Sequence, residues 1–361
     1  MKLAGLLLIV MVATATCHNI KTHKCVHDTK FKGYKSQVME DLSEETYRRR
    51  LQGSGTTSGS GSTTGSSSTS ADANVNDGWH PLRMFVDYAY ANKLINSNPS
   101  LGARYEMSIR LVESVKAYFN RLLNVNFMPI MRFSGGECYN NKILAYEKPI
   151  DLYITIFPEN DANTDYFAAA TPCYLSSRDG RPTIGAYILN FAFLKATPLN
   201  EYLYFSTFAH EFTHILGFSN DLFTRYVDST GRRRTEAEVT TKITIGSETF
   251  TAIKLPEVVN FARTYFNCPN IQGVPLENNG GDGSAGSHWE KLFLPQEYMN
   301  PTVENPGIIS EFTLTLLKAT GWYQVDMGGS QAYDWAAGAG CNIFQICPQG
   351  INGYCSSAQV G

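Results

Sequence analysis

The chain has 361 residues, of which 43% are hydrophobic and 12% aromatic, so it can bury a large core and is not a disordered chain. Its formal net charge is only -3 at pH 7, and it contains no stripe of Lys and Arg interleaved with aromatic residues. These features exclude nucleic acid as an expected partner.

The first fifteen residues have the pattern of a secretory signal peptide. Lys2 supplies a positive charge, residues 3–12 are apolar, and the small residues at 13–15 suit cleavage. No later segment offers eighteen uninterrupted apolar residues, and the polar end of the chain carries no lipid-anchor signal. We therefore expect a secreted or cell-surface protein without a transmembrane segment, for which association with a membrane surface stays open.

A low-complexity stretch follows a short charged segment. Residues 53–70 consist only of Gly, Ser and Thr, which cannot bury apolar surface and should form a flexible linker. Three consecutive arginines at 48–50 stand just before it and suit a processing protease. The sequence therefore predicts a signal peptide over 1–15, a propeptide over 16–50 and a linker over 51–77.

The rest of the chain mixes strands and helices without a regular alternation. Apolar runs with strand patterns predict strands over 82–90, 150–157 and 183–191. Apolar residues at three- and four-residue spacing predict a helix over 105–123, and further helices are expected over 202–216 and 308–320. Residues 218–287 are expected to be rich in loops. This mixture predicts the α+β class.

Cysteine usage agrees with an oxidising compartment. Apart from Cys17 beside the signal and Cys25 before the linker, six cysteines remain, enough for three disulfides. Six cysteines allow fifteen pairings, and the sequence does not choose among them. The six are Cys138, Cys173, Cys268, Cys341, Cys347 and Cys355.

The strongest motif is the pentad HEFTH at 210–214, placed on a predicted helix. Its two histidines, His210 and His214, are four residues apart, so both imidazoles project from one helix face and can bind one ion. Neutral imidazoles suit Zn²⁺. Glu211 is then placed to take a proton from a zinc-bound water that attacks a peptide carbonyl.

A catalytic zinc site needs a third protein ligand. Many proteases of this kind place a histidine three residues beyond a glycine equivalent to Gly217, but Asn220 occupies that position here. Beyond the linker only His80 and His288 remain. His80 lies at the edge of the linker, whereas His288 follows a Gly-rich stretch and precedes Trp289. His288 is the better candidate.

These motifs together resemble the leishmanolysin family of metzincin-type zinc proteases. HEFTHILG at 210–217 is followed by 70 residues, 218–287, and then by SHWEK at 287–291. The segment EYMNP at 297–301 is similar to the family's Met-turn, which would place Met299 beneath the zinc.

The resemblance implies a metzincin-like fold with one catalytic Zn²⁺. It implies an N-terminal catalytic lobe over 78–217, with a mixed twisted sheet and the active-site helix, and an insertion over 218–287. A loop-rich, disulfide-bonded C-terminal lobe over 288–361 would supply the third ligand. Residues 183–191 are expected to form an edge strand along which an extended peptide can pair.

The resemblance extends to the propeptide. The segment HKCVHD at 23–28 is similar to the family's latency motif, in which a propeptide thiolate fills the open zinc position. Thiolate is a strong zinc ligand, so Cys25 can displace the nucleophilic water. The alternative is a free or disulfide-bonded cysteine.

The sequence thus predicts a secreted zinc metalloendopeptidase, made as a latent precursor, that acts on protein or peptide substrates. One alternative is a non-catalytic cell-surface or adhesion protein of the same fold, against which an intact Glu211 argues. Another is a zinc-dependent hydrolase of a different bond. Cleavage preference cannot be predicted because the substrate pocket is not identifiable by residue.

Overall fold

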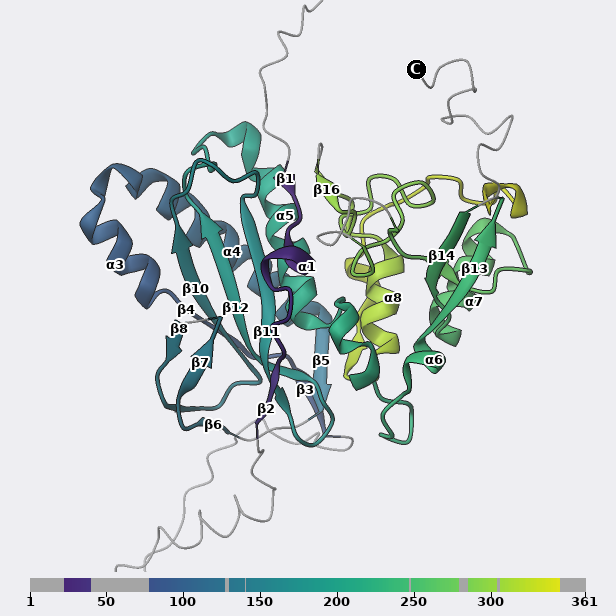
Figure 1. The fold of residues 1–361 in the computed structure, drawn as a ribbon, viewed down its shortest axis with the longest axis horizontal. Coiled ribbons are helices and arrows are strands. Elements are labelled where there is room, and N and C mark those ends of the chain that lie inside the picture. Colours follow the sequence, from purple (N-terminus) through teal and green to yellow (C-terminus); the bar gives the residue numbers. More distant parts are fainter. Residues whose placement is uncertain are drawn as a thin grey trace, which may run out of the picture.

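The computed structural model describes residues 23–39, 78–126, 130–139, 141–246, 248–278, 285–303 and 306–344. The predicted signal peptide, the arginines at 48–50 and the linker lie outside the described residues, as do Cys347 and Cys355. The fold is a mixture of helices and strands, which confirms the predicted mixed class (Figure 1).

A five-stranded mixed sheet organises the N-terminal half, in the order β2-β11-β12-β10-β4 (Figure 1). Strands β4, β10 and β12 run parallel, β11 is antiparallel to β12, and β2 is parallel to β11. The five strands are β2 (Gln37–Met39), β4 (Met84–Asp87), β10 (Leu152–Glu159), β11 (Ala168–Ser176) and β12 (Pro182–Asn190).

Both faces of this sheet are buried, which explains the continuous apolar runs of its central strands. Helices α4 (Gly102–Leu122) and α5 (Pro198–Leu216) pack on one face, where they share a core with Ile154 and Ile156 of β10. The alternate residues of β10, Tyr153 and Phe157, belong to a second core on the other face. Two short antiparallel pairs cover that second face: β6 (Met131–Phe133) with β9 (Tyr146–Lys148), and between them in the chain the hairpin of β7 (Gly136–Cys138) with β8 (Asn141–Ile143).

The prediction of an edge strand over 183–191 is wrong. This segment is β12, which is paired on one side with β10 and on the other with β11. The outer neighbour of β11 is β2, which belongs to the N-terminal segment, defined here as residues 23–39. Within the described residues, it is therefore β11 that has only this segment on its outer side.

One further expectation needs correction. The strand predicted over 82–90 ends at Asp87, because the Asp87 carboxylate accepts the Ala89 N–H and helix α3 (Ala89–Ser97) begins there. The region 218–287, expected to be rich in loops, also contains regular elements. It forms η2 (Asn220–Arg225), α6 (Glu236–Val239), a β13–β14 hairpin (Thr240–Ile245, Glu248–Ile253), α7 (Pro256–Phe266) and β15 (Val274–Pro275).

The C-terminal half packs beside the sheet through α7 and α8 (Glu311–Ala319) (Figure 1). The predicted helix over 308–320 begins three residues late, because the Ser310 side chain caps α8 by accepting the Phe312 N–H. A three-stranded sheet joins distant parts of the chain: β3 (Trp79–Pro81), β5 (Leu123–Asn126) and β17 (Tyr323–Val325). The remaining short elements are β1 (His23–Lys24), α1 (His27–Lys30), η1 (Pro99–Leu101), β16 (Thr302–Val303), η4 (Met327–Gly329) and η5 (Cys341–Phe344).

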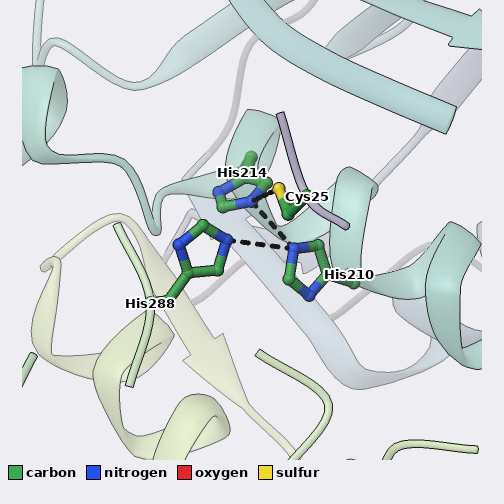
Figure 2. A group of neighbouring side chains, drawn as sticks. All are labelled: Cys25, His210, His214 and His288. Atoms are coloured by element: carbon green, nitrogen blue, oxygen red, sulfur yellow. Dashed lines mark hydrogen bonds between the residues drawn. The ribbon is translucent and has the colours of Figure 1, made fainter. Parts of the chain in front are cut away.

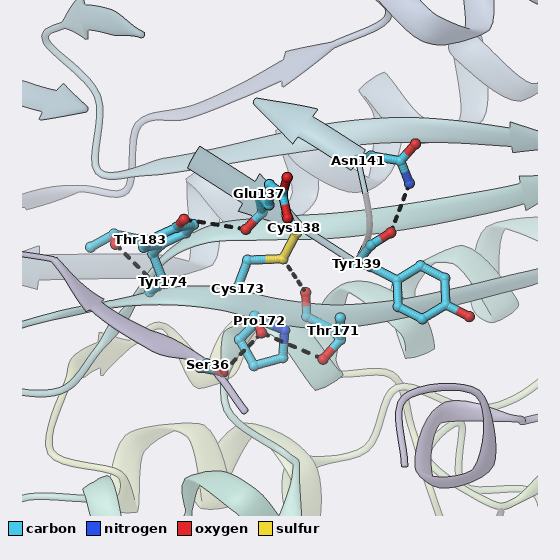
Figure 3. The surroundings of a disulfide bond; sticks show 10 residues. All are labelled: Ser36, Glu137, Cys138, Tyr139, Asn141, Thr171, Pro172, Cys173, Tyr174 and Thr183. Carbon is cyan, nitrogen blue, oxygen red and sulfur yellow. Dashed lines mark hydrogen bonds between the residues drawn. A yellow bond between two sulfur atoms is a disulfide. The ribbon is translucent and has the colours of Figure 1, made fainter. Parts of the chain in front are cut away.

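Two disulfides tie peripheral elements to the core. Cys138 of β7 is bonded to Cys173 of β11, which fixes a surface hairpin to the sheet (Figure 3). Cys268, just after α7, is bonded to Cys341. Two of the three predicted disulfides are therefore present within the described residues. In the same part of the chain, no helix combines the length and the apolar character needed to cross a bilayer.

Candidate metal centre

Helix α5 carries the predicted motif on its buried face. His210, Glu211 and His214 are all fully buried. His210 Nδ1 lies 2.6 Å from the Tyr298 carbonyl oxygen, and His214 Nδ1 lies 2.7 Å from that of Phe218. A carbonyl can only accept a hydrogen bond, so each Nδ1 carries the proton. Each Nε2 is therefore left with a lone pair directed away from its carbonyl partner.

His288 reaches the same point from the other half of the molecule. Its Nε2 lies 3.3 Å from His210 Nε2, which in turn lies 3.0 Å from His214 Nε2 (Figure 2). The peptide group that follows His288 is fixed, because its carbonyl accepts the Glu277 N–H and its N–H, that of Trp289, donates to the Met299 carbonyl. His288 is also fully buried.

Cys25 of the N-terminal segment completes the cluster. Its Sγ lies 3.4 Å from His214 Nε2 and 3.7 Å from Glu211 Oε1 (Figure 2). Its backbone N–H donates to the Pro301 carbonyl, which holds the thiol over the site. The four donor atoms, three imidazole nitrogens and one sulfur, lie within 4.8 Å of one another.

The electrostatics of this cluster favour a cation. Burial lowers the pKa of His210 to about 4 and lowers the pKa of His214 well below its ordinary value, so both rings are neutral. Burial, with the nearby Glu211, raises the pKa of the Cys25 thiol, and burial also raises the pKa of Glu211. Two bare imidazole lone pairs at 3.0 Å repel each other unless a positive charge lies between them.

The donor set fits zinc. With bonds of about 2.1 Å to nitrogen and about 2.3 Å to sulfur, a tetrahedral site has edges of about 3.4 Å between nitrogens and about 3.6 Å between nitrogen and sulfur. The corresponding distances here are 3.0 and 3.3 Å between nitrogens and 3.4 Å from nitrogen to sulfur. Three imidazoles with one thiol can therefore surround such an ion.

The two residues that were not chosen as third ligand, His80 and Asn220, lie outside this cluster. His80 lies in β3, where its Nε2 is 3.5 Å from Asp151 Oδ1. Asn220 begins η2, and its backbone N–H donates to the Ser287 hydroxyl beside His288. Met299 is fully buried. The residue before it, Tyr298, has the carbonyl oxygen that accepts the hydrogen bond from His210 Nδ1.

Two residues next to Cys25 contact the site but were not singled out from the sequence. The His27 ring stacks on the His214 ring with 4.1 Å between centroids and 9° between planes. Its Nδ1 donates to the Ala170 carbonyl, and its Nε2 accepts from the Ser219 hydroxyl. Asp28 accepts a hydrogen bond from the hydroxyl of Ser287. The sequence could have indicated both, because they belong to the HKCVHD segment that resembles the latency motif.

The N-terminal segment continues from the metal centre along the outer edge of β11. The Lys30 ammonium lies 2.9 Å from Glu159 and also contacts the Tyr166 hydroxyl. At the near end, β1 pairs with β16, so the segment contacts both halves of the molecule. The contacts to β11 and the loop before it are Lys24 N to Asp165 O, His27 Nδ1 to Ala170 O, Ser36 Oγ to Pro172 O, and the pairing of 37–39 with 174–176.

Comparisons with known proteins point to one family. The family model described as leishmanolysin matches residues 147–357. A leishmanolysin-like peptidase of Drosophila pseudoobscura pseudoobscura is 30% identical over 205 residues, which cover 49% of this chain and 30% of that protein. Leishmanolysin of Leishmania tropica is 28% identical over 192 residues, covering 53% and 27% of the two chains. A ciliated left-right organizer metallopeptidase of Danio rerio is 27% identical over 224 residues, covering 58% and 35%. The matched region thus spans about a third of the length of these relatives.

Proposed function

Because this chain belongs to the leishmanolysin family, we propose that it is a zinc metalloendopeptidase that hydrolyses peptide bonds in protein substrates. The observation that carries the proposal is the convergence of three neutral imidazoles beside a buried carboxyl group. His210, His214 and His288 would hold the ion, and Glu211 lies next to them without being one of the four clustered donors.

The roles of the side chains follow from their positions. When bound, a zinc ion would supply a Lewis acid and lower the pKa of a water at the site. Glu211, whose Oε1 lies 3.7 Å from Cys25 Sγ, would accept the proton of the attacking water and pass it to the leaving amine. The Tyr298 and Phe218 carbonyls keep His210 and His214 in the tautomer that exposes Nε2.

We further propose that the N-terminal segment keeps the precursor latent. Cys25 would act as the fourth ligand, and the segment would cover the outer side of β11. An extended substrate would then pair along the outer side of β11, and not along residues 183–191. Cutting near Arg48–Arg50 removes the tether but leaves the contacts of residues 23–39 intact, so activation requires the cut segment to dissociate.

For the domains and the location of the protein, we propose what the sequence predicts. A signal peptide over 1–15 would send the protein into the secretory route, to the outside or the surface of the cell. The two disulfides agree with folding in an oxidising compartment. The lobes would be 78–217 and 288–361, with 218–287 inserted between them.

The catalytic proposal is tested with Glu211→Gln in processed protein. The variant should keep its zinc and lose about 10²–10⁴-fold in kcat/KM for internal cleavage of casein, because only the proton acceptor is removed. Glu201→Gln, on the exposed first turn of the same helix, is the matched control. A Glu211→Gln protein as active as this control, or a wild type that binds zinc but cuts no protein, would exclude the proposal.

The metal ligands are tested by zinc stoichiometry. His288→Ala should lose zinc and activity, whereas His80→Ala should lose neither, because His80 lies beside Asp151 and outside the cluster. Normal zinc content in His288→Ala would remove His288 from the site.

For latency, a Cys25→Ala precursor should cleave casein before processing, and mercurial thiol reagents should activate the wild type. A silent Cys25→Ala precursor whose processed form is active would point to steric blockade alone.

A further inference from the structure

Glu297 is a buried carboxyl group to which no sequence motif gave a role. Only 1% of the residue is exposed. Its Oε1 accepts the hydroxyl hydrogens of Ser310 and Thr313 at 2.8 and 2.7 Å, and its Oε2 accepts the Met299 N–H at 2.5 Å. Burying a carboxyl group is costly unless it is hydrogen-bonded, and here three donors compensate. We call Glu297, Ser310, Thr313 and the Met299 N–H the Glu297 hub.

One arm of the hub leads to His210 and helix α5. The hydrogen bond from the Met299 N–H to the Glu297 side chain closes a turn around Tyr298, the residue between them, and so holds Tyr298 in place. Its carbonyl accepts from His210 Nδ1 at 2.6 Å. Its hydroxyl is 2.8 Å from the hydroxyl of Thr213, the residue before His214. The turn therefore contacts α5 beside both histidines of the helix.

A second arm leads to His288 and back to His214. The Thr313 hydroxyl donates to Glu297 and accepts the indole N–H of Trp289 at 2.8 Å. Trp289 follows His288 in the chain and is fully buried. Its ring packs edge-on against Phe218, with 4.8 Å between centroids. Phe218 supplies the carbonyl that holds His214 Nδ1.

We infer that the Glu297 hub is the positioning device that holds the three imidazoles at one point, with Thr313 as its connection to His288. This inference rests on the proposed zinc site. Glu297 and Thr313 touch neither the donor cluster nor a reacting atom in this arrangement, so neither is a catalytic residue. The α8 N-terminus belongs to the device, because Ser310 caps that helix and also donates to Glu297.

The first test measures zinc affinity of the full-length precursor by competition with a chelator. Thr313→Val keeps the shape but deprives Glu297 of a donor and Trp289 of an acceptor, so affinity should fall about 10–100-fold. Thr313→Ser keeps the hydroxyl and should restore most of the affinity. Thr315→Val is the matched control, because two positions along α8 place it on the opposite side of the helix. Equal affinities for Thr313→Val and Thr315→Val would overturn the inference.

The second test needs no metal. With ¹⁵N-labelled histidine in metal-free precursor, His210 and His214 should show one tautomer, protonated at Nδ1. Glu297→Leu removes the acceptor of the Met299 N–H, which should loosen Tyr298 and give His210 a mixture of tautomers. An unchanged His210 signal would contradict the hub. A wild type that binds no zinc, yet shows this change in Glu297→Leu, would overturn the proposed function and leave the hub in place.

Discussion

Gly185 of β12 packs against α5, the helix that carries two of the three proposed zinc ligands, His210 and His214. A Cβ at this position would lie 2.7, 2.8 and 3.1 Å from three side-chain carbons of Ile215, the neighbour of His214. Ile215 is fully buried, so it has no open space to move into. Overpacking of this kind costs about 1–3 kcal/mol. Gly185→Ala should therefore destabilise the full-length chain by that amount, a fall in Tm of about 1–2 °C for each kcal/mol in a chain of this length.

A double-mutant cycle isolates the contact. Ile215→Ala alone should cost about 2–5 kcal/mol, because it leaves a cavity. In the double variant the added methyl enters that cavity, so the total cost should fall short of the sum by about 1–3 kcal/mol. Urea unfolding in chelator, which removes any contribution from metal binding, gives the four free energies. Gly102→Ala, where an added Cβ meets nothing within 4 Å, is the control.

Two results would refute this reasoning. A Gly185→Ala precursor as stable as Gly102→Ala would show that β12 and α5 are not in close contact. Strict additivity in the cycle would show that the cost of the methyl group does not arise from Ile215.

Three further outcomes are expected. Replacing Cys268 and Cys341 by Ser opens a loop with a sequence separation of 73 and should lower the free energy of unfolding by about 4 kcal/mol, measured in urea; a loss under 1 kcal/mol would contradict this. Lys30→Ala removes the ion pair with Glu159 and should speed release of the cut segment roughly two- to five-fold, followed as the recovery of peptidase activity; an unchanged rate would show that the pair does not hold the segment. A chelator should lower the Tm of the wild type but not that of His210→Ala, and equal shifts in both would argue against metal bound at this site.

The local parts of the fold were predictable because their patterns are short-range. The helix around His210 was predicted from a strongly apolar run that ends at Gly217, and the structure places it at Pro198–Leu216, close to the predicted 202–216. The order of strands was harder. The run at 183–191 is apolar at nearly every position, which is typical of a strand buried on both faces rather than of an edge strand. The prediction instead relied on the short distance along the chain between this run and the helix that carries HEFTH. It therefore placed the strand wrongly at the edge of the sheet.

The surroundings of the site could be predicted only in part. Cys25 and His288 were selected by a known motif and by elimination, and the structure brings both to His210. Glu297 is the first residue of the quoted EYMNP segment, but the motif gave it no role, because its burial depends on packing against α8. The pairing of β2 with β11 likewise depends on contacts between segments more than a hundred residues apart.

The position of the N-terminal segment also affects how the protein behaves at high concentration. A β-strand with unpaired backbone groups can add a strand from another molecule, which leads to aggregation. In this structure, backbone and side-chain groups of residues 24–39 take up this side of β11 and of the loop before it. Loss of the segment would expose this edge, so a chain without residues 23–39 should aggregate more readily at high concentration than the full-length chain.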